Sequence, residues 1–204
     1  MQKLLTIPSY KETQVPSRLF GVERKLFPEL ENRKPFLKWA GGKSQLIPEL
    51  LKYIPSKFNK YIEPFIGGGA LFFGLNHSNS VISDSNEELI ITYNAVRDHV
   101  HSIVELLDRY VNDEKFFYQI RSFDPLKLTN IERAARLIFL NKTCFNGLYR
   151  VNKKGMFNVP YNKRKNEKFY NKATLINASL TLQNTTILLA DYKAVLNQYA
   201  RKDD

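Results

Sequence analysis

The segment 61–84 constrains the fold of this 204-residue chain more than any other part of the sequence. A short apolar run at 61–65 leads into three glycines, Gly67 to Gly69, and a helical pattern at 70–75 precedes a second apolar run at 81–83. Strands connected through a helix pair in parallel, because the chain must cross over before it can run again in the same direction. The segment therefore predicts the start of a parallel sheet with helices packed on it.

The rest of the chain continues this alternation around a helical insertion. Apolar spacing predicts helices over 43–54, 87–96, 101–110 and 171–182, helical structure from 113 to 149, a hairpin of two short strands around 152–155, a strand over 185–189 and a last helix ending near 199. We expect an α/β fold with three parts: an N-terminal arm (1–34), a sheet domain (35–97 and 183–204) and a helical, hairpin-bearing insert (98–182).

The charge balance favours a polyanionic partner. Lys and Arg number 31 against 20 Asp and Glu, which leaves a net charge of +11 at pH 7 and a pI near 9.6. Clustered cations bind nucleic acid by displacing counterions from its phosphates. An anionic membrane surface is the alternative, but the sequence shows no long apolar span and no strongly amphipathic basic helix, so no membrane partner is expected.

Cysteine and histidine usage excludes further classes. Cys144 is the single cysteine, which rules out a disulfide scaffold and a cysteine-ligated zinc site. The three histidines do not make a metal site on their own, and no metal is predicted. Lys3, Lys11 and the polar run between them interrupt any signal-peptide core, so we expect a cytoplasmic protein.

Most of the positive charge lies in the segment 141–172, which holds nine Lys and Arg and one acid, Glu167, for a net charge of +8. Aromatic and amide side chains alternate with the cations: Phe145, Tyr149, Phe157, Tyr161, Phe169, Tyr170, Asn146, Asn152, Asn158 and Asn162. Cations suit phosphates, Arg can read guanine, Asn can read adenine, and aromatic rings can stack on a base. The alternatives are a solvated face for the charges and ordinary core for Cys144 and the aromatics.

The glycine loop predicts a ligand site at the end of the first strand. Glycines let the backbone turn tightly and approach a ligand at a helix N-terminus. Asp84 ends the second strand, where an acid can hydrogen-bond ribose hydroxyls; a tight turn with a surface Asp is the alternative. The glycine spacing does not match the dinucleotide fingerprint, and Gly41-Gly42-Lys43-Ser44 lacks the earlier glycine of a phosphate-binding P-loop, since position 37 is Leu.

Four blocks in order carry a family resemblance: Phe36–Lys43, Tyr61–Phe73, Ser83–Leu89, and Cys144–Asn152 with Gly155–Tyr161. Together they resemble the Dam-type (D12 class) DNA adenine-N6 methyltransferases, which use S-adenosylmethionine (AdoMet). The likeness covers about residues 35 to 204. It implies a partial Rossmann-like methyltransferase sheet with a target-recognition insert, duplex DNA as substrate, and a GATC-like target site.

The resemblance also implies site residues. The cofactor set comprises Trp39, Lys43, Glu63, Phe65, Gly67, Gly68, Gly69 and Asp84. The DNA-binding set comprises Asn146, Arg150, Asn152, Pro160 and Tyr161. Lys38 is added to this set because of its charge and position and not because of the resemblance. A ring and a lysine suit adenine stacking and carboxylate pairing in the cofactor pocket.

One family motif is absent from these 204 residues. The family's catalytic Asp-Pro-Pro-Tyr does not occur, and Asp124-Pro125 is followed by Leu126 within the insert. We therefore expect a C-terminally truncated chain that is unstable, inactive in methyl transfer, or both, with strand 61–65 at a sheet edge. The remaining part would lie in a second polypeptide, or a frameshift has removed it. Two other functions stay open: a non-catalytic nucleic-acid-binding module, and an AdoMet-dependent enzyme acting on RNA or protein.

Overall fold

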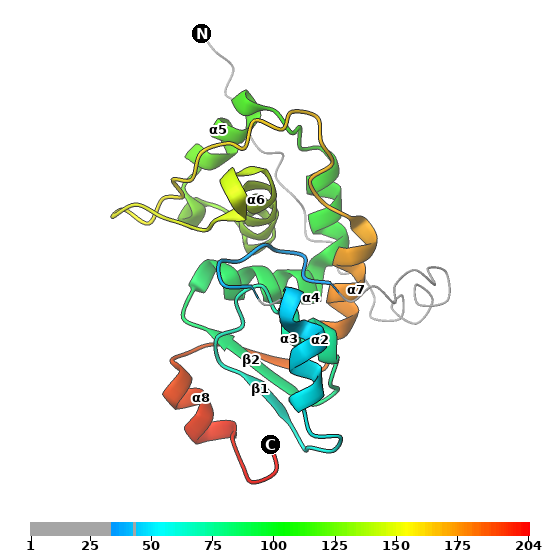
Figure 1. Ribbon diagram of the computed structural model, residues 1–204. Coiled ribbons are helices and arrows are strands. Elements are labelled where there is room, and N and C mark those ends of the chain that lie inside the picture. The colour runs from blue at the N-terminus through cyan, green and yellow to red at the C-terminus, as the bar shows by residue number, and fades with distance from the viewer. Residues whose placement is uncertain (1–33, 43) are drawn as a thin grey trace.

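The computed structural model describes residues 34–204 except Lys43 (Figure 1). The predicted arm therefore lies outside the described residues, apart from Lys34, and so does the cofactor candidate Lys43. The strands are β1 (Tyr61–Glu63), β2 (Ser80–Asp84) and β3 (Thr185–Leu189). The α-helices are α2 (Ile47–Leu50), α3 (Ala70–Leu75), α4 (Glu87–Asp108), α5 (Glu114–Ser122), α6 (Asn130–Thr143), α7 (Lys172–Leu182) and α8 (Tyr192–Tyr199).

The three strands form one parallel sheet in the order β1-β2-β3. Val81 in the central strand is in register with Ile62 of β1 and Thr186 of β3. The α/β class, the parallel pairing and all three strand positions predicted from the sequence are confirmed.

β1 is an edge strand of the described sheet, as expected, but it is shorter than predicted and only half-buried. It ends at Glu63 because the next residue, Pro64, has no backbone N–H to continue a ladder. Just before β1, the N–H of Asn59 donates to the Asp203 carbonyl over 2.9 Å. The end of the described chain is thus tied to the entrance of the first strand.

α4 is the central support of the molecule. Figure 1 shows the sheet, α2, α3 and α8 below it and α5, α6 and the loops after α6 above it. The helix packs on β2, β3, α6 and α7. The two predicted helices at 87–96 and 101–110 correspond to the two parts of α4, which meet at a kink at the non-helical residue His99 (φ −137°). The predicted domain boundary at 97 falls within α4.

The helix predicted over 43–54 is wrong in extent. Only α2 is α-helical there, flanked by 3-10 turns at Ser44–Leu46 and Leu51–Tyr53. Leu46 is 55% exposed and Leu51 40% exposed. Helices in proteins depend on burying an apolar face, and these leucines bury little.

The predicted pair of hairpin strands is also wrong in detail. The segment closes through a single antiparallel bridge, Val151 with Phe157, and a second bridge joins Cys144 to Tyr161 at its base. Backbone hydrogen bonds from Asn152 to Met156 (2.9 Å) and from Asn158 to Arg150 (3.0 Å) complete the turn. The hairpin exists, but side chains stabilise it as much as backbone pairing does.

Candidate cofactor and nucleic-acid site

The glycine loop after β1 is closed by its own hydrogen bonds. The Gly67 N–H donates to Asp84 Oδ2 over 3.1 Å, and the Ile66 N–H donates to the Ser83 carbonyl over 2.9 Å. Both bonds join the end of β1 to the end of β2. Gly67 (φ +49°) and Gly69 (φ +71°) adopt left-handed conformations that side chains disfavour.

Packing within the protein explains why these positions are glycines. A Cβ on Gly67 would lie 2.8 Å from the Trp39 ring, and a Cβ on Gly69 would lie 2.7 Å from the Tyr93 hydroxyl. The Tyr93 hydroxyl in turn donates to the Gly67 carbonyl over 3.0 Å. The tight turn was predicted, but the groups that approach these two glycines in this structure are Trp39 and Tyr93.

Asp84 stands at the carboxyl end of β2, half-buried, with both carboxylate oxygens engaged. Oδ2 accepts from Gly67, and Oδ1 accepts from the Asn86 N–H over 3.0 Å. A carboxylate offers about four lone-pair sites. Two sites remain for hydroxyl donors, which is the chemistry that a ribose diol needs.

Two tyrosines report the negative charge beside Asp84. Tyr93 is fully buried, and burial, then Glu63, then Asp84 raise its pKa well above the usual value. Burial followed by Glu63 also raises the pKa of Tyr61, whose hydroxyl donates to Glu63 Oε2 over 2.7 Å. Both phenols therefore stay neutral, and the predicted residue Glu63 lies in the same cluster as Asp84.

An aromatic pair stands at the same edge of the sheet. Phe65, just after β1, is 69% exposed, and its ring centroid lies 5.3 Å from that of Tyr192, which begins α8 after β3. Ligands of open α/β sheets bind at the carboxyl ends of the strands. Tyr192 was not among the predicted site residues. The only signal in the sequence was its position, an aromatic residue directly after Asp191 and just past the third strand.

Trp39 lies between the strand-end loop and the hairpin region. Its ring stacks on Tyr149 at a centroid distance of 5.2 Å and an interplanar angle of 20°. Gly67 and Gly68 approach the Trp39 ring and its Cβ, respectively, from the other loop. Tyr149 was predicted only as a member of the basic, aromatic segment, and its contact with Trp39 depends on tertiary structure that spacing does not reveal.

The segment 144–161, which we call the recognition loop, is anchored at its base. The Phe145 N–H donates to the Pro160 carbonyl over 2.9 Å. Tyr161 is only 6% exposed, and its hydroxyl donates to Asn112 Oδ1 over 3.0 Å. Its ring also contacts Phe117. The structure thus places the Tyr161 ring in the core and not on the surface that the DNA-binding prediction requires.

Side chains stabilise the tip of the recognition loop. Arg150 Nε donates to Asn158 Oδ1 over 2.7 Å. Asn152 Oδ1 accepts from the N–H groups of Lys154 (2.9 Å) and Met156 (3.1 Å), so this predicted base-reading amide closes the turn. Asn152 retains its amide donors for a partner.

The remaining DNA-binding candidates share one property: their side chains are exposed. This set comprises Lys38, Asn146, Arg150 and Pro160. Two apolar side chains beside Asn146 are exposed as well, Phe145 by 52% and Leu148 by 38%. Asn146 (φ +54°) and Gly147 (φ +65°) are both left-handed, which turns the chain sharply after α6 and presents these side chains outward.

Cations gather around this loop with few acids to neutralise them. In the part of the chain that the structure describes, Lys153, Lys154, Lys163 and Lys165 have no ion-pair partner. Burial, followed by the charge of Lys38, lowers the pKa of Lys142 to about 8. A cation with a depressed pKa beside a second cation is a site that an anion would stabilise.

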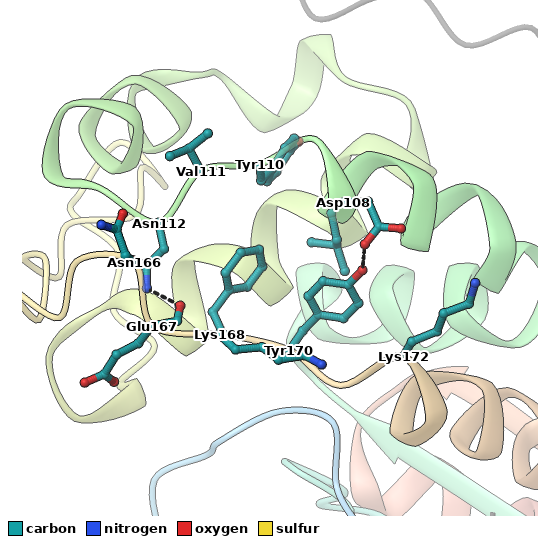
Figure 2. A pocket seen from close by; sticks show the side chains of 11 residues that line it. Asp108, Tyr110, Val111, Asn112, Asn166, Glu167, Lys168, Tyr170 and Lys172 are labelled. Atoms are coloured by element: carbon teal, nitrogen blue, oxygen red, sulfur yellow. Dashed lines mark hydrogen bonds between the residues drawn. The ribbon is translucent and has the colours of Figure 1, made fainter.

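A pocket of about 570 Å³ lies near the base of the recognition loop, where it is lined by Asn112, the partner of Tyr161 (Figure 2). It is lined by residues between 107 and 112 and between 166 and 172. Figure 2 shows Tyr170 bonded to Asp108 and the Asn112 amide bonded to the Glu167 carbonyl, a bond of 2.7 Å. These bonds hold the basic segment against the end of α4. Phe169 and Tyr170 of that segment line the pocket, but none of the residues in the cofactor and DNA-binding sets does.

No group of three or more His, Cys, Asp or Glu among residues 34–42 and 44–204 could hold a metal ion. Within the same residues, no helix is long and apolar enough to cross a membrane.

Comparison with known proteins gives close matches. Residues 39–204 match the family model of the D12 class N6 adenine-specific DNA methyltransferases. The chain is 43% identical over 183 residues to the Type II methyltransferase M.MjaIII of Methanocaldococcus jannaschii, an alignment that covers 79% of this chain and 63% of that protein. It is 33% identical over 186 residues to the DNA adenine methylase of Haemophilus influenzae, covering 89% of this chain and 64% of the relative.

The DNA adenine methylase of Escherichia coli is 31% identical over 179 residues, 86% of this chain and 63% of the relative. The chain spans between 57% and 64% of the length of the first three curated relatives. None of these matches supports the predicted second polypeptide, and none tests truncation or inactivity. Since the family model covers most of the chain and its motifs follow in order, this protein belongs to the D12 class of N6 adenine-specific DNA methyltransferases.

Proposed function

We propose that this chain provides the AdoMet-binding and target-recognition parts of a DNA adenine-N6 methyltransferase acting on a GATC-like site in duplex DNA. One observation carries the proposal. The strand-end loop with Asp84 and the cationic recognition loop are adjacent, joined by the stack of Trp39 on Tyr149. A cofactor site beside a basic, aromatic surface is what methyl transfer to an extruded base needs.

The residues at the sheet edge fit AdoMet. The free lone pairs of Asp84 would accept the ribose hydroxyls, and the exposed Phe65 would lie against the purine. Glu63 would add negative charge of the kind that suits a cationic sulfonium. When bound, AdoMet supplies an electrophilic methyl group on that sulfonium. From the sequence, Lys43 remains a candidate to pair with the carboxylate of AdoMet.

The recognition loop would bind and orient the DNA. Its unpaired lysines suit phosphates, and Arg150 keeps donors free beyond its bonds to Asn158 for a guanine edge. The exposed Phe145 can lie against bases that have lost a stacking neighbour. We do not propose a direct DNA contact for the buried ring of Tyr161.

Two binding assays and one transfer assay on the 204-residue chain test this function. We expect the chain to bind AdoMet, as measured by calorimetry. We also expect it to bind duplex DNA with an affinity that falls steeply with salt and is higher for a GATC duplex than for a scrambled one. Salt-steep binding that ignores AdoMet would indicate the non-catalytic module, and preference for duplex RNA would indicate an RNA enzyme. Transfer of a labelled methyl group would contradict the expected inactivity without affecting the two binding assignments.

A further inference from the structure

Asn141 is a buried amide in a position that no sequence motif marks. It lies in α6, three residues before Cys144, and its side chain is fully buried. An unpaired amide at such a site would destabilise the fold, because its polar atoms would lose their hydrogen bonds to water without gaining others. Its partners therefore explain why an asparagine is tolerated there.

All of those partners are backbone groups, in the distant segment at Lys38 and in the recognition loop just after α6. Asn141 Oδ1 accepts from the Lys38 N–H over 2.8 Å. Its Nδ2 donates to the Lys38 carbonyl over 2.8 Å and to the Gly147 carbonyl over 2.9 Å. One side chain thus pairs with both backbone groups of Lys38, as a neighbouring strand would, and ties Lys38 to the recognition loop.

The two tied segments pack in register. The Lys38 stem crosses Gly147 so closely that a Cβ there would lie 2.6 Å from Lys38 Cβ. The next residue, Trp39, stacks on Tyr149, two positions beyond Gly147. The pairs Lys38 with Gly147 and Trp39 with Tyr149 follow each other along both segments.

We propose that Asn141 is a positioning residue that fixes this register, and that the register sets how well the chain discriminates its DNA site. The inference rests on the proposed function, because Lys38 and Arg150 are the groups it would align against DNA. Asn141 itself lies too deep to touch a substrate. Its loss should leave each ligand able to bind but misplace the recognition loop relative to Lys38 and Trp39.

Two variants of the 204-residue chain test the proposal. Asn141→Asp keeps the acceptor for the Lys38 N–H but places a carboxylate oxygen against two carbonyls. Gly147→Ala, in a left-handed residue, displaces the Lys38 stem without changing α6. The control is Thr143→Val, which removes a buried hydroxyl that bonds only to Phe139 of the same helix.

The readout is the affinity ratio between a GATC duplex and a duplex with one guanine replaced. Both variants should lower this ratio by roughly tenfold, the worth of one good base contact. An unchanged ratio in both, or an equal loss in Thr143→Val, overturns the proposal. If Asn141→Asp does not fold, Gly147→Ala decides.

A second readout separates this inference from the proposed function. Trp39 is the only tryptophan, so its emission reports the stack on Tyr149 without any ligand. Asn141→Asp should shift that emission to the red relative to both the unmodified chain and Thr143→Val, and an unshifted emission overturns the register. If the unmodified chain shows no GATC preference, the proposed function fails, while the emission still tests the register.

Discussion

The strand-end loop and the recognition loop both turn through left-handed residues, yet they are stabilised in opposite ways. In the strand-end loop, Gly67 donates to Asp84 and a Cβ on Gly69 would meet the buried Tyr93. At the tip of the recognition loop, Gly155 (φ +75°) has nothing within 4 Å of where a Cβ would be. The glycines of the first loop are therefore packed against the core, whereas the tip of the second loop lies on the surface.

This difference has a functional meaning. A cofactor site benefits from groups already fixed in position, because no ordering cost then falls on binding. A surface that must fit a nucleic acid benefits from side chains that can still adjust, with only its base anchored. The backbone β-bridge between Cys144 and Tyr161 and the hydrogen bond from the Tyr161 hydroxyl to Asn112 anchor the base of the loop.

The largest effect should come from Gly69→Ala. A Cβ there would clash with Tyr93 and would lie 3.1 Å from the Phe73 ring, in a left-handed backbone. We expect a loss of roughly 2–5 kcal/mol in the free energy of unfolding, from backbone strain plus overpacking. Urea denaturation followed by circular dichroism measures it.

Gly155→Ala is the matched control for that prediction. It has a similar φ but open space, so only the backbone strain of about 1–2 kcal/mol applies. Equal losses for the two variants would refute the contrast between the loops.

Asp84→Ala should weaken AdoMet binding by roughly 10- to 100-fold, the worth of a hydrogen bond to a charged group. Non-specific DNA affinity should stay within about twofold, because Asp84 is at the carboxyl end of the central strand β2 and not on the recognition loop. Isothermal calorimetry and fluorescence anisotropy measure the two affinities.

Asp113→Ala controls for the loss of a structural aspartate. Asp113 caps α5 by accepting from the Phe116 N–H over 2.8 Å, far from the sheet edge. Its replacement should cost about 1 kcal/mol of stability and no AdoMet affinity. An Asp84→Ala protein that binds AdoMet normally would remove Asp84 from the site.

Arg150→Ala should reduce discrimination at one guanine by roughly 1–3 kcal/mol, the range for a bidentate contact. Competition binding with duplexes altered one base at a time measures this. Lys153→Ala, at the exposed tip, should weaken all duplexes equally. If Arg150→Ala behaves like Lys153→Ala, Arg150 contacts only phosphate.

The smallest effect concerns pH. The pKa of Lys142 is lowered to about 8 by burial and by Lys38, so this lysine is charged below pH 8 and neutral above it. If it contacts a phosphate, raising the pH from 7 to 9 should reduce the salt slope of DNA binding by about 0.9, the value for one contact. Lys142→Arg stays charged, and should abolish this change.

The lowered pKa of Lys142 also makes the free energy of unfolding depend on pH. Unfolded Lys142 keeps its proton to about pH 10.4, whereas the folded chain releases it near pH 8. Over that window the unfolded state binds more protons, so the stability of the fold increases with rising pH. A decrease in stability specific to Lys142 across this window would contradict the lowered pKa.

Local sequence predicted the elements that depend on local rules. The strand positions, α3 and α7 followed from glycines and apolar runs. The helix predicted over 43–54 failed because its leucines find no core, which spacing alone cannot reveal. At the candidate site, Asp84 was predicted from its place at the end of a strand. Asn141 and Tyr192 were missed because their roles depend on segments far away in the chain.

The construction of the recognition loop also bears on how this protein family can diversify. The base of the loop is fixed in the core by Tyr161, while the turn at its tip is closed from within, by Asn152 and by Arg150 with Asn158. Within the tip, Phe157 also reaches the core, since it is 5% exposed and its ring contacts Tyr149. If the tip reads DNA as proposed, exchange of its exposed residues between relatives, with Phe157 retained, would change the target site on an unchanged scaffold.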